Sequence, residues 1–418
     1  MKNIWPISGL RKFWDTEGEV AWLYAAAFFQ AFAGGTWLVA MPFVIKRLGG
    51  SDFDAGLCIG LSSAGYTVAL VMCLLGQAWM KYFNAKRMVQ LGSGTIAATM
   101  AGAYLTIAAA SKGYCGNSAI LVLIALATIQ GFITVIFWPL LVGWLSTDHE
   151  GPELNRRLGI FNTCWSLAGV ISPCIGGYLV KTNSTLPLMT STAIAALSFA
   201  SVSLVHKPQR RADTMKIGRV NANEDGTELL RWQFIWMGRI ALLTSFLCTG
   251  LVRSQLGLLF KFNLGFSESS YGVTITVMSA AILAALFTAG KTHKWHYVLS
   301  IFLAAQAAML LGILVILNGV GLWHFFLAVG LVGGGQGFLY SSHLYYVLSG
   351  AQNRSSRMAI HEITLSIGFL TGSIVGGYLS DSFGRYAPYW FGLTAVVAGL
   401  TAQSAILFLR RPGQEHNN

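Results

Sequence analysis

The chain has 418 residues, of which 54% are hydrophobic and only 11% are charged. Soluble domains carry about 25% charged residues, so the composition excludes an ordinary soluble enzyme and indicates a polytopic membrane protein. The net charge of +12 does not indicate nucleic-acid binding, because the basic residues gather on one side of the predicted membrane.

Twelve apolar stretches, each long enough to cross a bilayer as a helix, follow one another along the chain. They cover residues 20–45, 55–79, 88–110, 118–145, 158–180, 186–205, 233–260, 270–290, 296–318, 321–348, 358–380 and 387–409. Such runs exclude a membrane β-barrel, whose strands need about ten residues each. The predicted fold is therefore all-α, with a polar linker at 206–232 between two six-helix bundles at 1–205 and 233–418.

The distribution of Lys and Arg predicts the topology. Of the 28 such residues, 20 fall in segments on the side of both termini, and two, Arg239 and Arg253, fall within spans. The six in the opposite loops are Lys46, Arg47, Lys112, Lys181, Lys261 and Arg385. By the positive-inside rule both termini and the central linker are predicted to be cytoplasmic.

An internal repeat relates the two halves. Residues 157–179 align with residues 357–379 without a gap, and the copies share an Arg at the start and a Gly-Gly-Tyr-Leu run at the end. A second pair, Gln-Gly-Phe at 130–132 and 336–338, precedes them. The repeat predicts two similar bundles arranged in parallel order along the chain.

With these features the chain resembles the major facilitator superfamily of secondary transporters. The loop after helix two keeps Gly76, Lys86 and Arg87 of the superfamily signature but lacks its acidic residue. A fuller version stands at 377–385, on the opposite side of the membrane, where we expect a structural cap. Helix five is similar to the antiporter motif of proton-coupled exporters. Its matching positions are Gly159, Ala168, Ser172, Pro173, Gly176 and Gly177.

Polar and aromatic residues inside spans are the candidates for contact with a substrate, because such groups are costly in lipid. Each set shares one helical face, and the resemblance implies that helices one, four, seven and ten line a central cavity. The candidates are Gln30, Trp37, Gln130, Trp138, Gln336, Tyr340 and His343. The alternative is that the aromatic residues only pack between helices.

Arg253, in the later part of helix seven, is a further candidate. Its guanidinium could bind an anionic substrate in a bidentate manner. The alternative is that the side chain extends to the membrane surface, as long basic side chains do near helix ends.

Glu362 and His361 lie one turn into helix eleven, and Glu362 is the one carboxylate well inside a predicted span. Together with His343, these groups could carry a proton across the membrane. The alternative is a cytoplasmic gate in which Glu362 pairs with a basic residue at the start of helix five or helix eleven. The candidate basic partners are Arg156, Arg157 and Arg357.

The leading functional hypothesis is proton-coupled efflux of a small organic solute by alternating access. The alternatives are uptake of a sugar, nucleoside or organic anion, and a sensor or assembly factor that does not transport. No motif of an enzyme, an ATP-driven pump, a cofactor site or a metal site is present in the sequence. We expect a monomer in the lipid bilayer of a bacterial inner membrane.

Overall fold

The computed structural model describes residues 17–75, 84–114, 118–146, 151–206, 225–349 and 354–408. The first half contains α2 (Val20–Arg47), α3 (Asp52–Leu75), α5 (Ala85–Ala110), α6 (Ser118–Ser146), α7 (Gly151–Thr182) and α8 (Leu186–Ser203). The second half contains α9 (Asp225–Phe262), α10 (Glu268–Lys291), α11 (Leu299–Asn318), α12 (Leu322–Leu348), α13 (Arg354–Phe383) and α14 (Ala387–Phe408). Within these ranges all 12 helices are long and apolar enough to cross a membrane, which confirms the predicted fold.

Six helices begin earlier than the hydropathy pattern predicts, namely α3, α5, α7, α9, α10 and α13. α3 begins at Asp52 and α10 at Glu268, although the apolar stretches begin at 55 and 270. An acidic residue is favourable in the first turn, where the helix dipole is positive. α9 begins at Asp225, so its first turns occupy the end of the predicted linker, while residues 207–224 lie outside the described ranges.

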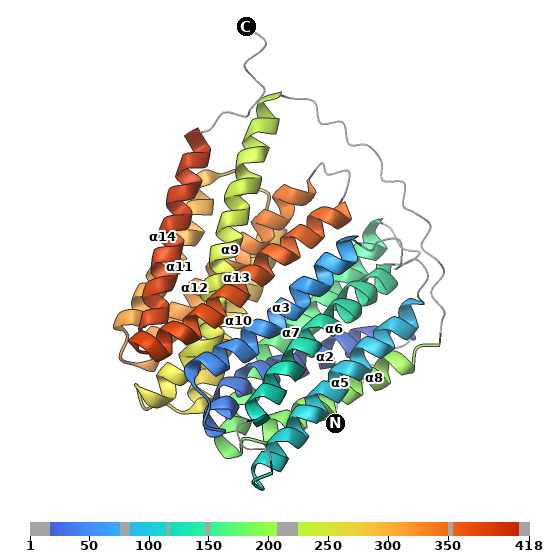
Figure 1. Cartoon of the computed structure of the whole chain (residues 1–418). Helices are drawn as coiled ribbons and strands as arrows, with labels where there is room; N and C mark the ends of the chain where they lie inside the picture. Colours follow the sequence, from blue (N-terminus) through green and yellow to red (C-terminus); the bar gives the residue numbers. More distant parts are fainter. Residues whose placement is uncertain are drawn as a thin grey trace, which may run out of the picture.

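The helices pack mainly with partners from their own half. In the first half α2 packs against α7 and α8, and α6 against α3 and α5; in the second, α9 packs against α12, α13 and α14. Two extensive pairs join the halves: α3 lies along α13, and α7 lies along α10 (Figure 1). Smaller contacts join α2 and α3 to α9. The helices that carry the sequence repeat, α7 and α13, therefore both lie at the junction between the halves.

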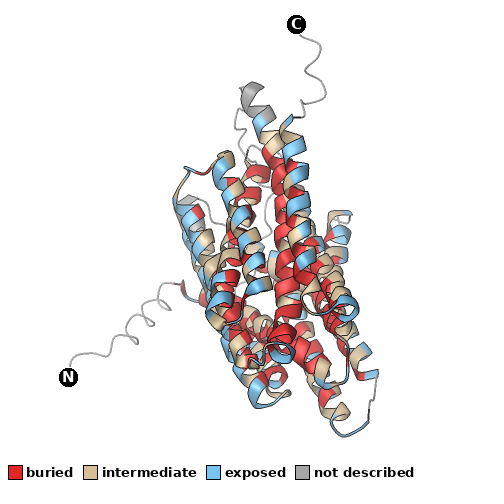
Figure 2. Ribbon diagram, turned by 90° about the vertical axis from the view of Figure 1, so that its left-hand side faces the viewer, coloured by how far each residue is buried: buried red, intermediate tan, exposed pale blue. Residues whose placement is uncertain are grey.

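Burial separates an interior from an outer apolar surface. Buried residues concentrate where helices face one another, and exposed residues lie along outward faces (Figure 2). Many exposed side chains are large and apolar, such as Leu121 and Phe287, which are 69% and 59% exposed. An apolar outer surface of this kind suits hydrocarbon, because helices satisfy their own backbone hydrogen bonds there.

The duplicated glycine pairs mark the closest approaches of the helices. The first glycine of each pair packs within its own half: Gly176 lies against Thr36 of α2, and Gly376 against Leu251 of α9. The second glycine of each pair packs against the other half. A Cβ added at Gly177 would lie 2.7 Å from the Glu268 carbonyl oxygen.

The equivalent glycine of the second copy has the equivalent contact. A Cβ added at Gly377 would lie 2.7 Å from the carbonyl oxygen of Asp52. Asp52 and Glu268 are the first residues of α3 and α10, so the two crossings are related by the same internal symmetry as the sequence. The repeat is therefore explained by packing: a side chain at either glycine would separate the halves.

Candidate functional site

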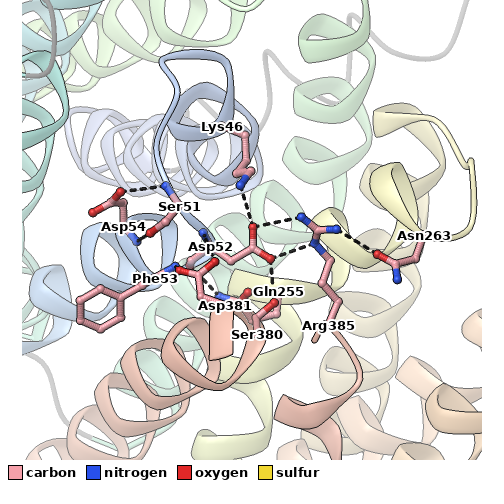
Figure 3. Close-up of polar contacts among 10 residues, drawn as sticks. All are labelled: Lys46, Ser51, Asp52, Phe53, Asp54, Gln255, Asn263, Ser380, Asp381 and Arg385. Atoms are coloured by element: carbon pink, nitrogen blue, oxygen red, sulfur yellow. Dashed lines mark hydrogen bonds and ion pairs between the residues drawn. The ribbon is translucent and has the colours of Figure 1, made fainter. Parts of the chain in front are cut away.

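Ionic contacts join the two halves at one end of the bundle, which we call the Asp52 end. The Asp52 carboxylate is 2% exposed and lies between Lys46 of its own half, at 2.9 Å, and Arg385 of the other half, at 2.8 Å (Figure 3). The Ser380 hydroxyl of α13 also donates to it, at 2.7 Å. The buried carboxylate therefore has two cations and a hydroxyl as partners, which is the condition for a stable buried charge.

A second acidic residue caps α3 from the opposite half. The Asp381 carboxylate accepts hydrogen bonds from the backbone N–H groups of Asp52 and Phe53, at 3.0 and 2.8 Å (Figure 3). These groups belong to the first turn of α3 and have no partner within that helix. The geometry fits the structural cap expected of segment 377–385.

A second ionic cluster lies at the same end, between α2 and α10. Glu268, which is 5% exposed, pairs with Arg47 at 3.4 Å and with Lys261 at 3.2 Å. The Arg47 guanidinium also donates to the carbonyl oxygen of Val180 in α7, at 3.0 Å. An open cavity of about 400 Å³ adjoins the cluster. Its lining residues are Phe43, Lys46, Arg47, Lys261, Phe262 and Glu268.

At the opposite end, which we call the Glu17 end, the ion pairs of the described residues stay within the first half. Arg156 pairs with Glu17 and Glu153, and Arg157 pairs with Glu153 at 2.9 Å. Hydrogen bonds from Arg156 and Arg157 lower the pKa of Glu153 to about 2. Within the described part of the chain, Glu362 forms no ion pair with Arg156, Arg157 or Arg357, so the gate hypothesis has no ionic contact here.

Nearer the Glu17 end, a hydrogen bond crosses between the halves. The Tyr66 hydroxyl of α3 donates to the Glu362 carboxylate of α13, at 3.2 Å. His361, next to Glu362, is fully buried and stacks on His343 of α12, with their Nδ1 atoms 2.7 Å apart. The Nε2 atoms of both rings are buried without a partner among the described atoms. The two histidines therefore meet where α12 and α13 pack, whereas the Glu362 carboxylate faces α3 of the first half.

The predicted substrate residues of the first half lie in two settings. Gln30 and Trp37 are 5% and 6% exposed and pack among neighbouring helices, although no partner is found for the buried Gln30 Oε1 atom. Gln130 is half-buried, and its Oε1 atom also lacks a partner among the described atoms. Trp138 packs edge-on against Phe161 of α7, with ring centroids 6.1 Å apart.

In the second half, the predicted face of α12 points towards its own neighbours. Gln336 accepts a hydrogen bond from Thr249 of α9 at 2.8 Å, and Tyr340 packs edge-on against His361, with centroids 4.8 Å apart. The structure therefore brings Tyr340, His343 and His361 together, but it does not bring them to Trp37 or Trp138 of the first half.

Arg253 of α9 is half-buried, and no ion pair is found for it among the described residues. Its backbone carbonyl oxygen accepts a hydrogen bond from Tyr271 of α10 at 2.7 Å, which fixes the backbone but leaves the guanidinium free of a carboxylate.

The ionic clusters at the Asp52 end are functional candidates that the sequence analysis did not identify, because Asp52 and Glu268 precede the apolar stretches. One feature of the sequence could have predicted these clusters. Four of the six basic residues that depart from the positive-inside pattern pair with Asp52 or Glu268. They are Lys46, Arg47, Lys261 and Arg385.

Comparison with known proteins gives a consistent family. The sequence profile of the Major Facilitator Superfamily matches residues 23–351 and 256–418. Multidrug resistance protein 1 of Bacillus subtilis (strain 168) is 22% identical over 389 residues, covering 89% of this chain and 92% of that protein. Multidrug efflux pump Tap of Mycobacterium tuberculosis (strain ATCC 25618 / H37Rv) is 26% identical over 234 residues, covering 53% and 52%.

Solved structures share the fold at low identity. A mutant of the nucleoside transporter NupG superposes with a TM-score of 0.74 at 14% identity, covering 93% of this chain and 100% of that one. A bacterial homolog of the human lysosomal transporter Spinster, in an inward-facing and unoccupied conformation, gives a TM-score of 0.66 at 14% identity, with 93% and 95% covered.

Proposed function

Because the chain belongs to the Major Facilitator Superfamily, we propose that it is a secondary active transporter that exports a small organic solute in exchange for protons. The solute binds between the two halves, and rocking of one half against the other exposes it to each side of the membrane in turn. Export is supported by the antiporter-like sequence of α7 and by relatives named for multidrug efflux.

The observation that carries the coupling proposal is the hydrogen bond between Glu362 and Tyr66, which joins α13 to α3. An ionised carboxylate accepts a hydroxyl hydrogen bond more strongly than a neutral carboxyl group does. Protonation of Glu362 therefore weakens a contact between the halves and shifts the balance of the two transport states. The His343–His361 pair, whose second member precedes Glu362 in the sequence, is the other candidate proton carrier in this scheme.

The ionic clusters indicate which state of the transport cycle this structure corresponds to. Because Asp52–Arg385 and Arg47–Glu268 join the halves, the Asp52 end is closed. If the termini are cytoplasmic, as the positive-inside pattern predicts, this state is closed towards the outside of a bacterial inner membrane.

Flux into proteoliposomes under an imposed pH gradient tests the coupling. We expect the transported solute, sought by comparing the cationic drug ethidium with labelled organic anions, to accumulate only when the gradient is present, and we expect Glu362→Gln to remove the dependence on the gradient. Glu153→Gln is the matched control, because the low pKa of Glu153 keeps that residue ionised across the working pH range. Gradient-independent flux in the wild type would reject proton coupling.

Uptake of an organic anion or a nucleoside is the second candidate function, and the unpaired Arg253 favours it. In that case Arg253→Ala abolishes uptake of an anion while sparing efflux of ethidium. Equal anion uptake by the variant and the wild type would remove Arg253 from the substrate site.

A further inference from the structure

Arg253 lies too far from the end of its helix to reach the membrane surface along it. α9 ends at Phe262, nine residues after Arg253. At 1.5 Å per residue the distance along the axis is about 13 Å, which is longer than an arginine side chain. Extension towards the nearer membrane surface therefore does not explain this residue.

The surroundings of Arg253 belong to both halves. One turn earlier, Thr249 donates a hydrogen bond to Gln336 of α12. One turn later, Gly257 lies against Phe43 of α2, whose ring would be 2.8 Å from an added Cβ. The Tyr271 hydroxyl of α10 reaches the Arg253 carbonyl oxygen. The segment of α9 that carries Arg253 therefore packs against α2, α10 and α12.

Arg253 differs from its neighbours on α9 in its exposure. From Leu251 to Phe260, every residue of α9 is fully buried except Arg253, which is partly exposed. Two residues further along, the Gln255 side chain donates to the Asp52 carbonyl oxygen at 3.4 Å (Figure 3). Arg253 thus lies just inside the closed Asp52 end, where a solute that enters from the Glu17 end would stop.

The two buried acidic residues at the Asp52 end already have cationic partners. Asp52 is bound to Lys46 and Arg385, and Glu268 is bound to Arg47 and Lys261. A cation that is enclosed without a counter-charge is costly, and such groups inside membrane proteins face a cavity or a ligand. The missing counter-charge at Arg253 is therefore one that a ligand can supply.

We propose that the transported solute carries a carboxylate or phosphate group and that the Arg253 guanidinium binds this group through two parallel N–H···O hydrogen bonds. The planar guanidinium fits both groups in this way, whereas a lysine ammonium would act only as a point charge. The proposal rests on the transport function proposed above and narrows its substrate class to organic anions.

Thermal unfolding of the purified protein with probes matched in shape but not in charge tests the proposal. The carboxylate arm compares benzoate with benzamide and benzylamine, within a larger set of such triplets, and the phosphate arm compares AMP with adenosine. We expect anionic members of one arm to raise the midpoint of wild-type unfolding and their neutral and cationic counterparts to leave it unchanged. Arg253→Gln should abolish the shift.

Arg239→Gln is the matched control, because Arg239 also lies on α9 but stacks on Trp236, with its Cζ atom 4.5 Å from the ring centroid. This variant should keep the shift caused by the anion. Stabilisation by cationic or neutral probes alone, or an anion effect that persists in Arg253→Gln, would overturn the proposal, as would a set in which no anion stabilises the wild type.

A variant without ligand separates a binding role from a structural one. Arg253→Met keeps a long side chain but removes the unpaired positive charge. We therefore expect the midpoint of thermal unfolding of this variant, measured without ligand, to equal or exceed that of the wild type. A clear fall would mean that the guanidinium stabilises the fold, which contradicts the proposal.

Flux of the best-stabilising anion in proteoliposomes separates this proposal from the proposed function. Anion flux that requires Arg253 but ignores the pH gradient would leave the anion site standing and reject proton coupling. Gradient-driven flux of ethidium that is equal in wild type and Arg253→Gln, with no anion flux in either, would reject the anion site and leave coupled transport standing.

Discussion

The two ends of the helix bundle hold the halves together by different chemistry. At the Asp52 end, two buried carboxylates, Asp52 and Glu268, each pair with a cation from the other half. Nearer the Glu17 end, a hydrogen bond between Tyr66 and Glu362 crosses the junction, and the ion pairs of the described residues stay within the first half. A transporter that alternates between two states needs such a difference, because both ends cannot be tightly closed at once.

Removing the charge of Asp52 should have the largest effect on this comparison. Asp52→Asn leaves Lys46 and Arg385 without their buried counter-charge, and breaking a buried ion pair costs about 3–5 kcal/mol. We expect a large fall in the thermal midpoint, together with increased labelling by thiol reagents of a cysteine placed near the Asp52 end.

Asp54→Asn is the matched control for that variant. Asp54 lies on the same turn of α3 and accepts a hydrogen bond from the Ser51 backbone N–H at 2.8 Å, but it has no cationic partner among the described residues. The asparagine side chain keeps an oxygen that can accept this hydrogen bond, so the variant should cost less than about 1 kcal/mol. If the two variants lose equal stability, the contact between the halves at Asp52 contributes little.

The glycine crossings should give an intermediate effect that is equal on both sides of the internal symmetry. Gly177→Ala and Gly377→Ala each place a methyl group 2.7 Å from a backbone carbonyl oxygen of the other half. Overpacking of this kind costs about 1–3 kcal/mol. Thermal unfolding should show similar losses for both variants.

Gly34→Ala serves as the control for the glycine variants, because nothing lies within 4 Å of its added Cβ. Alanine favours a helix more than glycine does, so this variant should be at least as stable as the wild type. Unequal losses of thermal stability in the Gly177 and Gly377 variants would indicate that the two crossings do not contribute equally to the packing of the halves.

The smallest effect is expected at the weaker end. Tyr66→Phe removes the hydroxyl group that binds Glu362 and should cost about 1 kcal/mol, roughly a fivefold change in the balance between the two states. We expect nearly unchanged thermal stability but an altered pH profile of transport. A pH profile identical to that of the wild type would exclude this contact from the coupling.

The sequence predicted the fold well because a long apolar helix is specified locally. The number of spans, their order and the two related halves all follow from hydropathy and from the repeat at Arg157 and Arg357. The same hydropathy criterion did not identify Asp52 and Glu268 as helical, because it assigns a charged residue in the first turn of a helix to the preceding loop.

The candidate site was predicted less completely, because helical spacing gives the face of a residue but not the helix that it meets. Tyr340 and His343 do share a face, yet that face meets α13 of the same half and not the first half. Arg157 was a candidate partner of Glu362 but pairs with Glu153 instead, four residues earlier on the same helix. Such pairings depend on the tertiary packing of the helices.

The most direct test of the account is the distance between the halves at both ends, measured by spin labels on a protein without its native cysteines. One pair joins Tyr114 to Phe383 at the Asp52 end, and the other joins Leu75 to Phe408 at the Glu17 end; all four positions are exposed. On introducing Asp52→Asn, the account predicts that the first distance increases while the second decreases. Two distances that stay fixed, or that increase together, would contradict alternation between two closed ends.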